Sequence, residues 1–421
     1  MKKNVLVFPC GSEIGLEVYR ALKFSKDFNL IGGSSVDDHG KFVYENYIED
    51  IPFVDDDLFV DKINNIIEDY KIDLIIPAHD SVVLKLAQFS DRINAIIVSS
   101  NLRACDICRS KRKTYEVFKE TLPVPIVYDS IEQVDKYPVF LKPSVGQGAK
   151  GTKKVNNYDE LKAYYENRNE DLLILEYFPN DEYTIDCFTN FNGDLIYCAG
   201  RKRNRISNGI SVSSIEVEKP EFKDLARIIN DELNMNGAWF FQLKERANGE
   251  LGLLEIAPRI AGTMEFQRAF GVNLPLLSLY NALEIPVSIV RNNYQVQMDR
   301  ALSTTFKIDY DYKNVYVDLD DTLIVDGKVN YELLAFLYKC LNENKKIILI
   351  SRHAINPIDT LEKYQIYNFF DEIIHIEDKK NKSDYVKAES IFIDDSHAER
   401  EDVFEKVKVP VFDVNMIDVL K

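Results

Sequence analysis

The sequence predicts a multidomain protein that combines the α/β and α+β classes. Its 421 residues, 46% of them hydrophobic, are enough to build several hydrophobic cores. Short buried strands alternate with helices at both ends of the chain, which indicates parallel sheets, whereas the middle contains strand pairs typical of hairpins. We therefore expect three domains, at residues 1–104, 105–305 and 306–421.

The first domain is predicted to hold a parallel sheet covered by helices. Its strands are expected at Asn4–Phe8, Asp73–Pro77 and Ala95–Ser99. A turn with two glycines, Gly11 and Gly15, follows the first strand, at a corner that faces ligands in many α/β folds. The G-x-x-x-G spacing differs from the dinucleotide fingerprint, so it does not indicate a nicotinamide cofactor.

The second domain contains a glycine-rich loop. A strand over Pro138–Lys142 leads into the loop Pro143–Gly151, and a second strand returns over Lys153–Asn156. A polar helix and then the segment Ile174–Asp186 are expected to follow. Glycines let backbone N–H groups approach a polyphosphate closely, and Lys142 is placed to neutralise phosphate charge.

A hairpin with an Asn-Gly turn is predicted further along, from the strands Ala238–Leu243 and Leu251–Arg259. Its two strands carry Gln242 and Glu255, whose oxygens are suitable ligands for Mg²⁺. Arg259 is placed to stabilise a developing negative charge. The alternative is a surface hairpin with solvated charges, but the glycine loop, the acidic strand end and the hairpin together favour a phosphate site.

The third domain begins with the sequence VYVDLDDTL, a buried strand that runs directly into acidic residues. Further strands are expected at Lys346–Ile350 and Ser390–Ile393. Asp318 and Asp320 follow the first strand, Val315–Val317, two positions apart. Buried carboxylates are costly unless they are neutralised, and a divalent cation is the usual remedy.

Composition limits the functional classes. A net charge of −17 argues against nucleic acid or an anionic membrane as the main partner, and no apolar run is long enough to cross a bilayer. Cys105 and Cys108 form a lone C-x-x-C without a second pair, so zinc is not indicated and a cytoplasmic chain with reduced thiols is expected. One basic cluster is a candidate anion site: Arg201, Lys202, Arg203 and Arg205.

Residues 1 to about 300 resemble the ATP-grasp superfamily, especially the branch with the large subunit of carbamoyl phosphate synthetase and many carboxylate–amine ligases. The segments that carry the resemblance are SKRKTYEVFKE, FLKPSVGQGAKG, ILEYFPNDEYTID and FFQLKE…LLEIAPRIAGT. It implies a Rossmann-like pre-ATP-grasp domain followed by an ATP-grasp domain, with a lid at about 115–185. It implies that Lys111 contacts the nucleotide and Lys142 its phosphates, beside the glycines of the loop, Gly146, Gly148 and Gly151. Glu176 and Tyr177 would lie at the adenine, and Glu182 at the ribose.

The resemblance also implies a reaction in which ATP converts a carboxylate into an acyl phosphate that an amine then attacks. It makes Gln242 and Glu255 ligands of Mg²⁺, and Arg259 the contact of the acyl phosphate. Ala257 stands where the family usually has asparagine, which removes one metal ligand. The candidate substrate contacts lie at the strand ends of the first domain and are Gly11, Ser12, His79 and Asp80. For His79, a structural role is an open alternative.

From Val315 onward the chain resembles the haloacid dehalogenase superfamily, through the motifs DLDDTL, ILISRH and IFIDDSHAERED. The resemblance implies a Rossmann-like phosphatase domain in which Asp318 attacks phosphorus and Asp320 protonates the leaving alcohol. Ser351 and Lys382 would hold the transferring oxygens; Lys382 is one of several lysines in its segment. The implied Mg²⁺ ligands are Asp318, Asp320, Asp394 and Asp395.

The intervals between these motifs predict that the third domain has no cap. Only 28 residues separate Thr322 from Ser351, and 30 separate Ser351 from Lys382. An open site would suit bulky phosphoesters, or a substrate handed over by a neighbour. A degenerate domain kept for structure or dimerisation is the alternative.

The leading functional hypothesis is a bifunctional enzyme with ATP and Mg²⁺ as cofactors. The front would join a carboxylate to an amine, and the rear would hydrolyse a phosphoester, for example after coupling of a phosphorylated amine. One alternative is a regulatory or assembly protein that binds ATP or a metabolite and has a non-catalytic rear domain. Another is bicarbonate activation of the carbamoyl phosphate synthetase kind. The expected partners are small molecules, and a homodimer through the front domains is compatible with the sequence.

Overall fold

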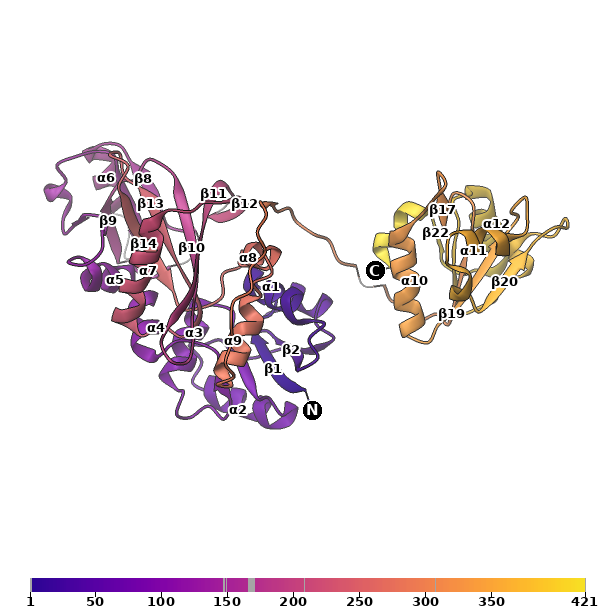
Figure 1. Ribbon diagram of the computed structural model, residues 1–421, viewed down its shortest axis with the longest axis horizontal. Coiled ribbons are helices and arrows are strands. Elements are labelled where there is room, and N and C mark those ends of the chain that lie inside the picture. The colour runs from indigo at the N-terminus through magenta and orange to yellow at the C-terminus, as the bar shows by residue number, and fades with distance from the viewer. Residues whose placement is uncertain are drawn as a thin grey trace. The chain divides into compact units, whose positions relative to one another are not determined.

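The computed structural model describes residues 2–146, 148, 150–165, 171–207, 209–306 and 308–420. The chain divides into two compact units, Met1–Leu302 and Ser303–Lys421 (Figure 1). Gln147 and Ala149, in the predicted glycine loop, lie outside the described residues. Among the helices that are described, none combines the length and the hydropathy needed to span a bilayer.

A five-stranded sheet opens the first unit, with strand order β3-β2-β1-β4-β5 and every neighbouring pair parallel. Its strands are β1 (Lys3–Phe8), β2 (Phe28–Gly33), β3 (Asn46–Ile48), β4 (Leu74–Pro77) and β5 (Ile96–Ile97). The helices between and after them are α1 (Glu13–Leu22), α2 (Phe59–Tyr70), α3 (Asp80–Gln88) and α4 (Leu102–Arg109). The predicted strands are confirmed, although β5 is only two residues long.

The first strand and helix show how local sequence builds this sheet. The side chains of Val5, Leu6 and Val7 are fully buried, as expected for a parallel strand covered on both faces. Ser12 then caps α1, because its Oγ accepts a hydrogen bond of 3.0 Å from the N–H of Gly15. The cap places Ser12 at the carboxyl edge of the sheet.

Two antiparallel sheets complete the first unit. The six-stranded sheet has the order β14-β13-β10-β11-β12-β15, and the four-stranded sheet has the order β6-β9-β7-β8. The strands of the larger sheet are β10 (Glu182–Thr189), β11 (Leu195–Ser207), β12 (Ile210–Glu216), β13 (Gly237–Glu245), β14 (Leu251–Ala257) and β15 (Gln297–Asp299). Those of the smaller sheet are β6 (Val127–Tyr128), β7 (Val139–Pro143), β8 (Lys153–Val155) and β9 (Leu172–Glu176).

The predicted segment Ile174–Asp186 is divided between these two sheets. β9 ends at Glu176 in the smaller sheet, and β10 begins at Glu182 in the larger one. Pro179 lies in the connection, and it has no N–H with which to continue a ladder. The connection therefore joins the two sheets at the place where the resemblance puts the adenine.

The predicted hairpin is confirmed. The N–H of Arg246 donates to the carbonyl of Glu250 at 2.8 Å, and the N–H of Gly249 donates to the carbonyl of Arg246 at 3.0 Å. Gly249 has a φ of +88°, so the loop has three residues and ends in a left-handed glycine. The predicted Asn-Gly pair, Asn248 and Gly249, forms the last two positions of this three-residue loop.

The six-stranded sheet is apolar on the face that packs on α7 (Pro220–Leu233). Phe222, Ile229 and Leu233 of this helix share a core with Ile185 and Phe241 of the sheet. Side chains alternate between the faces of a strand, so the opposite face presents the residues between them. The remaining helices of this unit are α5 (Lys111–Phe118), α6 (Tyr158–Tyr165), α8 (Glu265–Ala269) and α9 (Leu274–Ala282).

The second unit is built on a five-stranded parallel sheet of order β20-β19-β16-β21-β22, beside a small hairpin. The strands of the sheet are β16 (Asn314–Val317), β19 (Lys346–Ser351), β20 (Glu372–His375), β21 (Ser390–Ile393) and β22 (Val411–Phe412); the hairpin pairs β17 (Ile324–Val325) with β18 (Lys328–Val329). The helices are α10 (Tyr331–Asn342), α11 (Pro357–Lys363) and α12 (His397–Val407). Short 3-10 helices are η1 (His39–Phe42) and η2 (Ile131–Gln133) in the first unit, and η3 (Tyr367–Phe369), η4 (Lys382–Asp384) and η5 (Val414–Val419) in the second.

Helices cover both faces of the second sheet. Val315 and Val317 pack with Phe336 of α10 on one face. Tyr316, between them in the sequence, packs with Val403 of α12 on the other. Asp318, Asp394 and Asp395 follow the carboxyl ends of β16 and β21, between these layers.

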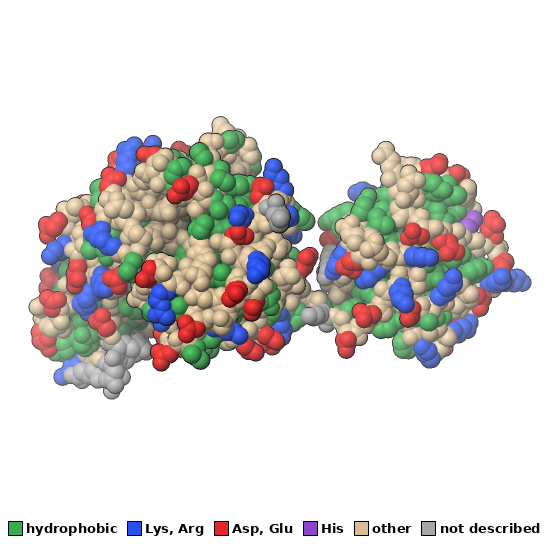
Figure 2. Space-filling model, turned by 90° about the horizontal axis from the view of Figure 1, so that it is seen from below, with side chains coloured by type: hydrophobic (Ala, Val, Ile, Leu, Met, Phe, Trp, Pro, Cys, Tyr) green, Lys and Arg blue, Asp and Glu red, His purple; other side chains and the backbone are tan. Residues whose placement is uncertain are grey.

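Figure 2 shows charges of both signs on one face of each unit. On the face drawn in Figure 2, basic side chains are interspersed with acidic ones over the described residues, and hydrophobic side chains appear singly or in small groups. Several basic side chains of the first unit lie instead in the wall of a cavity, among them Lys142, Lys244 and Arg259.

Candidate active sites

The first unit contains a cavity of about 860 Å³, lined by residues of its two antiparallel sheets and by residues that follow β1 and β4 of the parallel sheet. Most of the predicted site residues lie in its wall: Ser12, His79, Lys142, Gly148, Glu176, Tyr177, Glu182, Gln242, Glu255 and Arg259. The other predicted residues lie outside the wall. Lys111 reaches the carbonyl of Gly146 at 3.4 Å, Asp80 binds Arg259, and Gly11 packs against Asp38. The carbonyl of Gly151 accepts a hydrogen bond from Tyr164.

Two lysines and a glutamate meet at one end of this cavity. The Nζ atoms of Lys142 and Lys111 lie 3.6 Å and 3.8 Å from the carboxylate of Glu255. Burial favours the neutral acid, but the two ammonium groups outweigh it and hold the pKa of Glu255 below its usual value. Burial, together with the charge of Lys142, lowers the pKa of Lys111 to about 8. An excess of positive charge in a partly dry site is suited to phosphate groups.

Arg259 is held in place by Asp80. Its Nε and Nη2 donate to the two carboxylate oxygens of Asp80 at 2.6 Å and 2.9 Å. Burial opposes ionisation of this carboxyl, but the guanidinium overcomes it and lowers the pKa of Asp80. Asp80 begins α3, directly after β4, so the first sheet orients an arginine that belongs to the end of the hairpin. The sequence suggested Asp80 as a substrate contact, and in the structure its carboxylate is bound by Arg259.

Strand register sets a row of polar side chains across the cavity face of the six-stranded sheet. Glu255 pairs with Gln242, Gln242 pairs with Thr184, and Thr184 pairs with Arg201. Directly paired residues point to the same face, so these four side chains follow one another from β14 to β11. Gln242 and Glu255 are therefore neighbours, as a shared cation requires. Ala257 is buried in the core, so Gln242 and Glu255 are the candidate oxygen ligands that the hairpin offers.

Glu182 lies one row further along, surrounded by cations. Its carboxylate contacts Arg203 and lies 3.6 Å from the Nζ of Lys244. Arg203 also lies 3.5 Å from the Oε1 of Gln242. Lys244 was missed in the sequence, although it stands two positions after Gln242 and so must point to the same face.

The predicted adenine contacts lie at the junction of the two antiparallel sheets. The carboxylate of Glu176 accepts the N–H of Ile126 at 3.3 Å and lies 3.4 Å from Arg246. The ring of Tyr177 lies beside that of Phe140, with 6.4 Å between their centroids. Aromatic and apolar walls around a few polar groups are typical of sites for planar bases.

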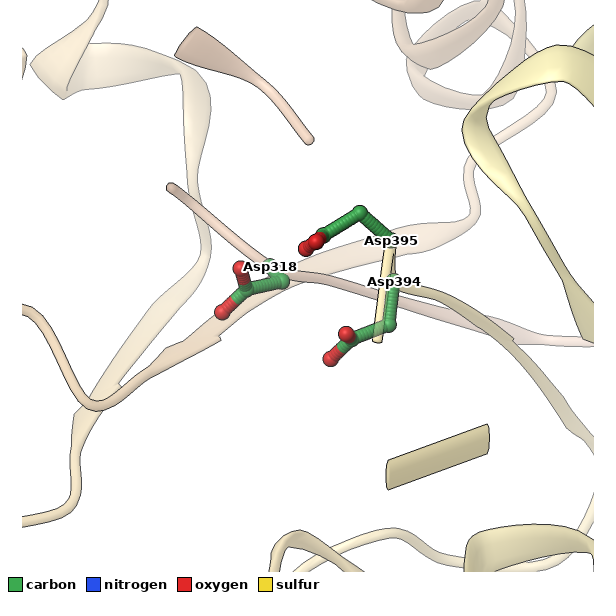
Figure 3. A group of neighbouring side chains, drawn as sticks. All are labelled: Asp318, Asp394 and Asp395. Carbon is green, nitrogen blue, oxygen red and sulfur yellow. The ribbon is translucent and has the colours of Figure 1, made fainter. Parts of the chain in front are cut away.

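In the second unit, three carboxylates converge at the carboxyl ends of two paired strands. Asp318 follows β16, and Asp394 and Asp395 follow β21, which is the parallel neighbour of β16. The three residues offer oxygens that all lie within 4.8 Å of one another. Figure 3 shows the three carboxylates directed to the same side of the strand ends. Their number and spacing fit a divalent cation.

Lys382 bridges the two buried members of this group. Its Nζ donates to Asp318 at 2.6 Å and to Asp394 at 2.7 Å, and all three residues are buried. Despite the lysine, burial and the charge of Asp394 raise the pKa of Asp318 to about 7, and burial raises that of Asp394. The remaining repulsion between carboxylates is the kind that Mg²⁺ relieves.

The other predicted residues of the second site lie around this cluster. Ser351 ends β19 and is buried, and its Oγ accepts the N–H of His353 at 3.1 Å. Asp320 was expected among the metal ligands, but its side chain lies outside the carboxylate group and binds the Nδ1 of His353 at 2.8 Å. The Nε2 of His353 lies 2.8 Å from the hydroxyl of Thr360. This histidine was not singled out from the sequence, although it follows Ser351 by two positions.

Comparison with known proteins defines the class of the first unit. It has the ATP-grasp fold. One similar structure is the biotin carboxylase domain of the 2-oxoglutarate carboxylase of Hydrogenobacter thermophilus, which was solved with MgADP and bicarbonate. The match has a TM-score of 0.59 and 19% sequence identity, and it covers 70% of this chain and 74% of that one. The N5-carboxyaminoimidazole synthetase of Staphylococcus aureus, solved with ADP, matches with a TM-score of 0.60 and 16% identity, over 72% and 83%.

Two sequence matches point in the same direction. Residues 168–304 match a family described as "ATP-grasp in the biosynthetic pathway with Ter operon". The carbamoyl-phosphate synthase of Methanobrevibacter smithii is 26% identical in an alignment 198 residues long, which covers 40% of this chain and 53% of that protein. The chain thus spans about half the length of this curated relative. The assignment of the second unit to the haloacid dehalogenase superfamily stays a prediction that rests on its motifs.

Proposed function

We propose that the first unit is an ATP-dependent, ADP-forming ligase that joins a carboxylate to an amine. The supporting observation is that one cavity, within a unit that has the ATP-grasp fold, is lined by Lys142, Gln242, Glu255 and Arg259. A carboxylate oxygen of the substrate attacks the γ-phosphorus of ATP, and the bond to the β–γ bridging oxygen breaks to release ADP. The amine lone pair then attacks the acyl carbon, the C–O bond to phosphate breaks, and the nitrogen loses a proton.

The residues of the chain supply charge and position for these steps. Lys142 and Lys111 neutralise phosphate oxygens, and Arg259, fixed by Asp80, meets the negative charge that develops on the acyl phosphate. Gln242 and Glu255 would hold Mg²⁺, which when bound neutralises the phosphates. A loop that closes over the site would keep water from the acyl phosphate.

For the second unit we propose hydrolysis of a phosphate monoester. Asp318 attacks phosphorus, the ester P–O bond breaks, and the leaving alcohol takes a proton from Asp320. Water, deprotonated by Asp320, then cleaves the aspartyl phosphate and regenerates the carboxylate. Lys382 lies against Asp318 and would orient it, and the Asp318, Asp394 and Asp395 cluster would hold Mg²⁺.

A coherent combination of the two reactions is coupling of an amine that carries a phosphate, followed by removal of that phosphate by the second unit. The intervals between the motifs of the second unit contain β17, β18 and α10 before β19, and α11, η3 and β20 before Lys382. These elements are small, which is consistent with a site that accepts a bulky ligated product.

Separate inactivation of the two units tests this division. Glu255→Ala is expected to abolish ADP formation and spare hydrolysis of a generic aryl phosphate, and Asp318→Asn is expected to do the reverse. Exposed acids provide matched controls, Glu250→Ala in the same hairpin and Asp359→Asn on α11, and both should retain both activities. Persistence of ADP formation in Glu255→Ala, or of phosphatase activity in Asp318→Asn, would contradict the assignment of that site.

Bicarbonate is a second candidate for the carboxylate. One matched structure holds bicarbonate together with MgADP, and the curated relative is a carbamoyl-phosphate synthase. ADP formation that depends on bicarbonate, in the absence of any organic acid, would favour this substrate over amide ligation to an organic acid.

A further inference from the structure

Arg201 is a buried arginine whose guanidinium is only partly used. It lies on β11 and is 1% exposed, and its Nε and Nη2 donate to Asp186 at 2.8 Å and 3.3 Å. Gln267 donates a further hydrogen bond of 2.8 Å to Asp186. One edge of the guanidinium is thus fixed by a carboxylate that is itself held in place.

The other edge has no partner among the residues that the structure describes. The Nη1 atom of Arg201 is buried and makes no hydrogen bond to the described residues, and Arg201 lines the ligand cavity. A buried donor left without an acceptor costs about 1–3 kcal/mol, and more when it is charged. Asp186 already balances the charge of Arg201, so the unmet requirement at Nη1 is an oxygen acceptor rather than a counterion.

Strand register gives the place of this donor in the site. Arg201 pairs with Thr184, and Thr184 pairs with Gln242, so Arg201 lies two strands from the predicted metal ligand. Neighbouring strands are about 4.8 Å apart, which puts roughly 10 Å between the two positions along the row. This is too far for one carboxylate to contact both, but it is within the reach of a small organic acid.

We propose that Nη1 of Arg201 binds a second oxygen group of the acid substrate, remote from the carboxylate that is activated beside Gln242 and Glu255. The inference rests on the ligase function proposed above and narrows its substrate. The substrate class is an acid with a carboxylate or carbonyl oxygen at its far end. Apolar residues of the same wall, among them Ile14, Phe240 and Ile210, provide surface for the carbons between the two groups.

The test uses three matched acids with the full-length protein and MgADP. Valerate ends in a methyl group, glutaramate in a neutral amide and glutarate in a carboxylate, and the homologues one carbon shorter and longer complete the set. At the length that fits, we expect calorimetry to give dissociation constants about tenfold lower for the acceptor-bearing acids than for the methyl-ended acid. Tighter binding of glutarate than of glutaramate would identify a carboxylate as the far group.

Variants then assign the difference to Arg201. Arg201→Lys keeps a cation beside Asp186 but removes the Nη1 donors, and it should abolish the preference while leaving MgADP binding intact. Arg227→Lys, the same change at an exposed pair with Asp224, should keep the preference. If Arg201→Lys does not fold, the double variant Arg201→Gln with Asp186→Asn, which replaces the ion pair by a neutral one, takes its place.

Two results would overturn the inference. In the wild-type protein, equal affinity for methyl-ended and acceptor-ended acids at every length would show that Nη1 is satisfied by internal water instead. A preference that survives the loss of Nη1 would place the acceptor site elsewhere. Failure of the wild-type protein to bind MgADP would instead refute the ligase function itself, so the two failures are distinguishable.

Discussion

Replacement of Lys382 by methionine is expected to destabilise the second unit strongly when magnesium is absent. The methionine side chain is close in size to that of lysine but carries no charge. Asp318 and Asp394 would therefore face each other without the ammonium group of Lys382 that now contacts both. Asp318 is 5% exposed and Asp394 is 1% exposed, so water cannot replace the lysine. Loss of one partner from such a buried ionic group costs about 3–5 kcal/mol.

The size of the effect should depend on pH. The pKa of Asp318 is already raised to about 7, above its unfolded value of 3.8, so the folded form binds its proton more tightly than the unfolded chain does. Its contribution to stability is therefore fully present below about pH 4 and is lost as the pH rises through 7. Without Lys382 the carboxylates hold a proton more strongly still. The destabilisation should be near its full size at pH 8 and smaller at pH 5.

The loss of stability would be measured by unfolding the protein in urea, with a chelator present, and monitoring the transition by circular dichroism. The only tryptophan, Trp239, lies in the first unit, so its fluorescence serves as an internal control that should not shift. Adding Asp394→Asn, or millimolar Mg²⁺, should restore much of the lost stability. If Lys382→Met has wild-type stability at pH 8 without magnesium, the carboxylates do not repel one another as described, and the basis for a metal there is lost.

Three further predictions concern the first unit. Asp80→Asn should free Arg259 and lower kcat for ADP formation by about 10–100-fold with little change in KM for ATP, as measured by steady-state kinetics. Gly252→Val should raise KM for ATP by roughly tenfold, because a Cβ at this glycine would lie 2.3 Å from the ring of Phe178 in the cavity wall. An unchanged KM would show that the ring of Phe178 can move aside without affecting ATP binding. The pKa of about 8 for Lys111 predicts that calorimetric affinity for MgADP falls as the pH rises above 8, since the phosphates select the protonated lysine; Lys111→Arg should remove this dependence.

Sequence reasoning located the elements that carry strong local signals. The strands that became β1, β7, β16 and β21 are apolar runs bounded by turn residues, and each lies within a residue or two of its predicted position. The motif residues at their ends follow from that placement, because the carboxyl ends of parallel neighbours must meet. The resemblance to the haloacid dehalogenase superfamily put Asp318 and Asp394, 76 positions apart in the chain, at one site, and the structure brings them together because β16 and β21 are parallel neighbours.

Partnerships that depend on tertiary packing could not be predicted in this way. Nothing local indicates that Asp80 orients Arg259, since 179 positions separate them. The same is true of Lys382, which was chosen from several lysines by order alone. The split of the segment around Pro179 into strands of two sheets was also unforeseen, because the pattern is apolar on both sides of the break.

The separate cores of the two units have a practical consequence. Described side chains of each unit form hydrophobic clusters of their own. The connection from the end of β15 at Asp299 to the start of β16 at Asn314 carries no regular structure in its described part. Protease cleavage within this stretch should release two halves that stay folded and can be assayed in isolation. An uncut chain, by contrast, delivers its two sites to the cell in strictly equimolar amounts.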